Sequence, residues 1–138
     1  MTDMTAQDAP RPRRARGARE SLAQIVLVFE SIVVFLAGLV VYGLRTLPAG
    51  IDQWWGIVGG AVVAFIMIVT SGFVRHDAAI VVGWILQAVL AASALLVPAN
   101  LIVALIFGGF WAYATIKGAS LDRRNARLAA EAESRNGD

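Results

Sequence analysis

The stretch SLAQIVLVFESIVVFLAGLVVYGL runs from Ser21 to Leu44, and its only formally charged side chain, Glu30, lies near its middle. An α-helix rises about 1.5 Å per residue, so a stretch of this length can cross a hydrocarbon core of roughly 30 Å with some tilt. The stretch therefore predicts a membrane-spanning helix. The remaining segments are interpreted relative to it.

The composition also indicates a membrane protein, because 58% of the 138 residues are hydrophobic and only 16% are charged. The basic residues gather before the first apolar stretch and after the last one. Basic ends can bind nucleic acid, but no nucleic-acid recognition motif accompanies them, so we expect them to flank a membrane domain. The chain has no cysteine, which excludes disulfides and cysteine-ligated metals.

Three more apolar segments follow the first. The second opens with the aromatic pair Trp54-Trp55, and Pro98 ends the third, leaving so short a turn that the fourth must return antiparallel. We expect an all-α integral membrane four-helix bundle in residues 19–119. Residues 1–18 are expected to form a disordered basic cytoplasmic tail, and residues 120–138 a polar cytoplasmic tail with a helical extension. The expected spans are about 21–44, 54–74, 79–97 and 101–116.

The distribution of lysine and arginine predicts the orientation. Five precede the first span, five follow the last, Arg45 lies in the first connection and Arg75 in the second, which places eleven on one side and one on the other. The side with more positive charge is the cytoplasmic one. Both termini are therefore expected in the cytoplasm of a multi-pass protein of the cell membrane.

Small residues at four-residue spacing mark helix faces that can approach closely in lipid. The second span has Gly56 and Gly60, and the fourth has Ala104, Gly108 and Ala112. These five are the expected helix-packing positions. The Gly56/Gly60 face also leaves open a parallel homodimer.

Glu30 and Gln87 form the candidate intramembrane polar site. Each lies eight or nine residues from the cytoplasmic start of its span, so the two share a depth, and small residues flank both. A carboxyl group at that depth is expected to be neutral, hydrogen-bonded or next to a wet cavity. Three roles remain open: fixing helix register, binding a proton or cation, and meeting a partner protein.

No other set of residues suggests catalysis. A Ser/His/Asp set, metal-ligand spacing, a glycine-rich phosphate loop and paired carboxylates are all missing from the sequence, so we expect neither an enzyme nor a bound cofactor or metal. The single histidine, His76, is interpreted as a loop residue, and Asp77 as a cap of the third span.

The motif Leu27-Val28-Phe29-Glu30, its basic lead-in from Arg16 to Arg19 and the later Gly108-Gly109-Phe110-Trp111 resemble an uncharacterised actinobacterial family of small four-span integral membrane proteins. The resemblance covers roughly residues 16–120. It implies a location in the cell membrane and no particular activity.

Three classes of function follow from these observations. The first is a structural or accessory membrane protein, with the lipid bilayer as its surroundings and a homo-oligomer or larger membrane protein as its possible partner. The second is a proton-coupled small transporter that uses Glu30, because small multidrug exporters are similar in having four short spans and a Glu in the first. Those exporters commonly form antiparallel dimers, which the eleven-to-one charge distribution disfavours. A membrane enzyme is the third.

Overall fold

The computed structural model describes residues 15–137. The first fourteen residues of the expected disordered tail, 1–18, lie outside this range, and its last residue, Ala18, begins a helix instead. The described part is all-helical, without a strand. Its four helices are α1 (Ala18–Leu44), α2 (Trp55–Gly72), α3 (Asp77–Ser93) and α4 (Asn100–Asn136).

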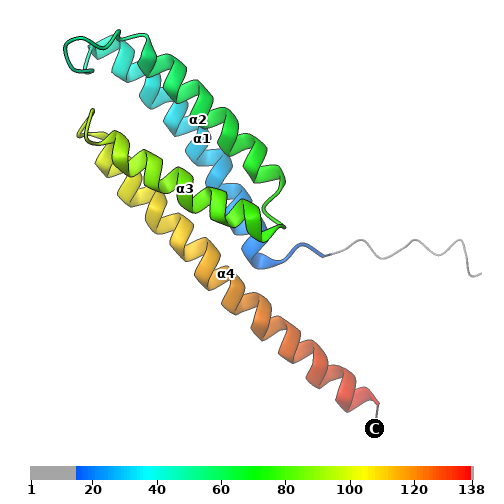
Figure 1. The fold of residues 1–138 in the computed structure, drawn as a ribbon. Helices are drawn as coiled ribbons and strands as arrows, with labels where there is room; N and C mark the ends of the chain where they lie inside the picture. Colours follow the sequence, from blue (N-terminus) through cyan, green and yellow to red (C-terminus); the bar gives the residue numbers. More distant parts are fainter. Residues whose placement is uncertain (1–14, 138) are drawn as a thin grey trace, which may run out of the picture.

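The four helices form two antiparallel hairpins, α1/α2 and α3/α4 (Figure 1). α1 packs along both α2 and α4, α3 packs along α4, and the contact between α2 and α3 is much less extensive. α1 and α3 therefore lie diagonally across the bundle. The two hairpins approach least where α2 faces α3.

The connection between α1 and α2 has a defined start and end. Arg45 adopts a left-handed conformation with φ 52°, and its N–H and that of Thr46 bond back to the carbonyls of Tyr42 and Val41, which is a common way to end a helix. The Gln53 side chain then bonds both the N–H and the carbonyl of Leu47 at 3.0 Å. The loop is thus held by its own hydrogen bonds.

α3 ends at Ser93, four residues before the expected end of the third span at Val97. The chain after Ser93 continues in tight turns, in which the N–H of Leu95 bonds the carbonyl of Ala92 and the N–H of Leu96 that of Ser93. Pro98 disfavours a helical conformation at Val97, so the turns after Ser93 do not continue as a helix past that residue.

Three of the helices, α1, α2 and α4, are long and apolar enough to cross a membrane, and α3 is a shorter apolar helix of 17 residues. Many of their large apolar side chains face outward: Phe29, Phe65 and Leu105 are each about two-thirds exposed, at 64%, 66% and 68%. Extended exposed apolar surface is typical of proteins that contact lipid or a partner. The helices are therefore compatible with a membrane protein.

The core between the helices is small. It consists of alanine, aliphatic, methionine and tryptophan side chains from all four helices and the turn after α2: Ala23, Leu27, Val34, Met67, Val74, Leu86, Leu90, Ala104 and Trp111.

α4 extends far beyond the bundle (Figure 1). Gly118 is its last buried residue, and from Arg123 to Asn136 every residue is exposed. That exposed part is an unbroken helix about 20 Å long. The helical extension expected after the fourth span is thus present and reaches almost the end of the chain.

Candidate functional site

Glu30 and Gln87 meet at the centre of the bundle. Glu30 on α1 has no exposed surface, and Gln87 on α3 is 6% exposed. The Gln87 amide nitrogen donates to both carboxyl oxygens of Glu30, at 2.8 Å and 2.7 Å. Because α1 and α3 are diagonal in the bundle, this side-chain pair joins two helices that share little backbone contact.

Small residues make room for the pair. The Trp111 ring on α4 is fully buried and lies so close to Gly83 that a Cβ atom there would overlap it. A Cβ atom at Gly108 would lie 3.7 Å from the Gln87 side-chain oxygen, an ordinary contact. Gly83 thus admits the indole, whereas the position of Gly108 beside the amide would also accommodate an alanine.

Two buried polar atoms, one of them in the pair, have no hydrogen-bond partner among residues 15–137. They are the Gln87 oxygen Oε1 and the Trp111 indole nitrogen Nε1. Buried polar atoms normally have partners, so such atoms need a reason. Half a turn of the Gln87 amide would present its oxygen to a protonated Glu30, so the pair can adapt chemically to either protonation state of the carboxyl group.

The glycines expected to pack helices do so within the chain. Gly56 and Gly60 of α2 face Gly38 of α1, where an added Cβ atom would lie 2.5 Å from the Gly56 carbonyl oxygen. The close α1–α2 contact covers the face for which a homodimer had been considered. In α4, Ala104 is buried in the core and Ala112 is half-buried.

Gly38 was not among the expected packing positions. Its spacing to Val34 and Val41, which are also buried, is the signal that places it on the inner face of α1.

A second polar cluster, also missed, joins the starts of α1 and α3 to the middle of α4. The Asp122 carboxylate of α4 accepts hydrogen bonds from the N–H groups of Ala18 and Arg19, at 2.6 Å and 3.1 Å, and so caps α1. The Arg19 guanidinium in turn pairs with Asp77 at 3.1 Å. Asp77 had been expected to cap α3, but its side chain is 91% exposed and engages Arg19 instead.

No metal centre is formed by the residues that the structure describes. Within 15–137, no three His, Cys, Asp or Glu side chains come together in a way that could hold an ion.

The fold and the buried pair define an all-helical protein with apolar helices compatible with a membrane. The chain belongs to the family described as protein of unknown function DUF4233, whose pattern matches residues 20–127. That range includes all of α2 and α3, the buried pair and Asp122. No curated protein matches the chain, and no solved structure matches it.

Proposed function

We propose that this protein is a structural or accessory component of the cell membrane, crossing the bilayer four times with both ends in the cytoplasm. The orientation is supported by the eleven-to-one distribution of lysine and arginine. α3 has only 17 residues, but the apolar run from Ala94 to Val97 lengthens its apolar segment toward the thickness of a bilayer.

The exposed end of α4 is the main observation that supports an accessory role. This polar helix projects from the bundle, and Asp122 at its base is bonded to the start of α1. A helix anchored in this way presents its side chains to a partner with little loss of conformational freedom. Its basic residues Arg123, Arg124 and Arg127 offer a surface for an acidic partner.

The buried pair suits the same function. Both oxygens of Glu30 accept hydrogen bonds from Gln87, and the pair lies inside the core rather than on a surface. Polar side chains that bond across helices fix rotation and depth in a membrane bundle. In this proposal, Glu30 and Gln87 hold the bundle that supports the projecting end of α4.

Affinity isolation of the full chain from native membranes in mild detergent tests the accessory role. A partner in fixed stoichiometry is expected with the full chain. It should be lost when three exposed arginines are replaced by alanine and retained when three other exposed residues of the same helix are replaced. The test variant is Arg123/Arg124/Arg127→Ala, and the control is Glu131/Glu133/Ser134→Ala. Isolation of the chain alone would contradict the proposal.

A proton-coupled transporter is the second candidate, and an unpartnered polar atom on the residue bonded to Glu30 favours it. Within residues 15–137 the Gln87 oxygen has no hydrogen-bond partner, which leaves hydrogen-bonding capacity on the side chain that contacts this carboxyl group. A carboxyl group in such surroundings is a common element of proton relays. Flux of a small cation in proteoliposomes that follows a pH gradient and disappears in Glu30→Gln would place this function first.

A further inference from the structure

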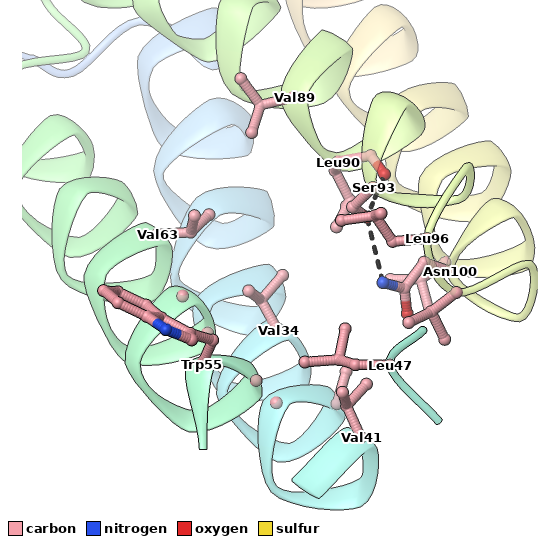
Figure 2. Close-up of a pocket in the computed structure, with 17 residues that line it drawn as sticks. Val34, Val41, Leu47, Trp55, Val63, Val89, Leu90, Ser93, Leu96 and Asn100 are labelled. Carbon is pink, nitrogen blue, oxygen red and sulfur yellow. Dashed lines mark hydrogen bonds between the residues drawn. The ribbon is translucent and has the colours of Figure 1, made fainter. Parts of the chain in front are cut away.

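A cavity of about 210 Å³ lies between the two hairpins, on the side where α1 and α2 are connected. Figure 2 shows Val34, Val41 and Trp55 on one side of it, and Leu90, Leu96 and Asn100 on the other. The cavity thus occupies the region where α2 and α3 make little contact.

The lining is almost entirely hydrocarbon. Its hydroxyl and amide groups bond within the protein: Ser93 donates to the Leu90 carbonyl at 2.6 Å, and the Asn100 amide donates to the Ser93 hydroxyl at 3.0 Å. A water molecule needs two to four polar partners, and apolar cavities of roughly 150 Å³ stay dry and take up apolar molecules. The chemistry of this cavity therefore favours an apolar occupant over water.

The cavity has a deep floor and a mouth on the outer surface. Val34 and Leu90 at the floor are 5% and 6% exposed, whereas Val89 and Leu96 at the rim are 46% and 48% exposed. Gly59 also lines the cavity, and no atom lies within 4 Å of the position that its Cβ would take. The mouth is continuous with the apolar outer face of the helices.

We infer that this cavity binds an acyl chain of a phospholipid, inserted sideways between the two hairpins. The inference rests on the proposed bilayer insertion, because in a bilayer the molecules next to the apolar rim are lipid tails. A helix of a second copy is about 10–12 Å wide with its side chains and is too thick for a cavity of this volume. A lipid tail is thin and flexible enough to enter the cavity, and its apolar surface matches the apolar lining.

The test uses the full chain in liposomes containing a phospholipid with a photoreactive diazirine near the end of one acyl chain. After illumination, mass spectrometry of peptides locates the label. Label is expected at the floor residues Val34 and Leu90 as well as at the outward-facing Phe65. In Gly59→Leu, whose side chain would take up part of the cavity, the label at the floor should be lost while the label at Phe65 remains.

Two further variants complete the design. Gly109→Leu is the matched control, because Gly109 is also exposed, has no atom within 4 Å of its Cβ position and does not line the cavity. It should leave the label at the floor unchanged. Val89→Trp closes the mouth from the α3 side and should also remove that label, which provides a second test if Gly59→Leu fails to fold.

Four results would overturn the inference. They are a floor without label in the original chain, a label that persists in Gly59→Leu, a label that persists in Val89→Trp, and loss of label in Gly109→Leu as well. If Phe65 is also unlabelled, bilayer insertion fails together with the lipid site. Label at Phe65 alone overturns only the lipid site.

Discussion

Replacing Gln87 by leucine tests the hydrogen bonds at the centre of the bundle. The substitution removes both bonds to Glu30 and leaves a fully buried carboxyl group without its donor. A hydrogen bond between neutral groups contributes about 0.5–1.5 kcal/mol, and leaving a buried polar group without its partner costs about 1–3 kcal/mol. We expect Gln87→Leu to lower the free energy of unfolding by about 2–4 kcal/mol.

A double-mutant cycle separates this interaction from changes in packing. Glu30→Leu alone leaves the Gln87 amide without its partner, whereas Glu30→Leu together with Gln87→Leu removes both members and should cost less than the sum of the single changes. The expected coupling energy is about 2 kcal/mol. It exceeds the roughly 0.6 kcal/mol average measured in another membrane bundle, because this carboxyl receives two bonds inside the core.

The assay is reversible unfolding in mixed micelles, followed by circular dichroism. Thr115→Val serves as the control, because the Thr115 hydroxyl is buried but bonds only to carbonyls of its own helix, at 2.8 Å and 3.3 Å. Its loss should cost less than about 1 kcal/mol. Additive single changes, or a Gln87→Leu variant as stable as the Thr115 control, would refute the role given to the pair.

The other predictions concern packing and the polar cluster. Gly38→Val should destabilise the bundle by about 1–3 kcal/mol in the same assay, because the valine side chain would meet the backbone of α2. Gly43 has open space around its Cβ position, so Gly43→Val should cost less than about 1 kcal/mol. Equal effects of the two variants would contradict the close contact at Gly38. Asp122→Ala removes the cap of α1 and should lower the free energy of unfolding by about 0.5–2 kcal/mol. Amide hydrogen exchange should become faster only in the first turn of α1. Unchanged exchange there would argue against the cap. Gly83→Val should displace the Trp111 ring and change its fluorescence, and an unchanged spectrum would argue against their contact.

The helices were predictable because their signals are local. Hydropathy, Pro98 and the short connections indicate four helices, and three of these are long and apolar enough to be candidate spans. The juxtaposition of Glu30 and Gln87 was predicted from their shared depth and from the small residues that flank both. Depth along a helix can be counted in the sequence.

Rotation about a helix axis was harder to predict. The third helix carries two stripes of small residues, and the stripe that contains Gly83 and Gln87 faces inward, whereas Ala88 and Ala92 are exposed. An apolar span in lipid has no polar face to mark its outside, so its inner side depends on packing with other helices. Gly38 was missed for the same reason.

The cluster around Asp122 was unpredictable for a different reason. Its partners at the start of α1 are more than 100 residues away in the sequence, and the tail that carries it has no hydropathy signal. The length of α4 beyond the bundle likewise depends on polar residues, whose pattern predicts a helix but not where it ends.

Site-directed labelling of the chain tests the proposed membrane topology most directly. The sequence contains no cysteine, so single cysteines can be placed without background at Ala49, Ala99 and Ser134. With a membrane-impermeant maleimide on intact cells, the account predicts that positions 49 and 99 react and that position 134 reacts only after the membrane is opened. Labelling at position 134 in intact cells, or protection of position 49 or 99, would contradict four crossings with both ends inside.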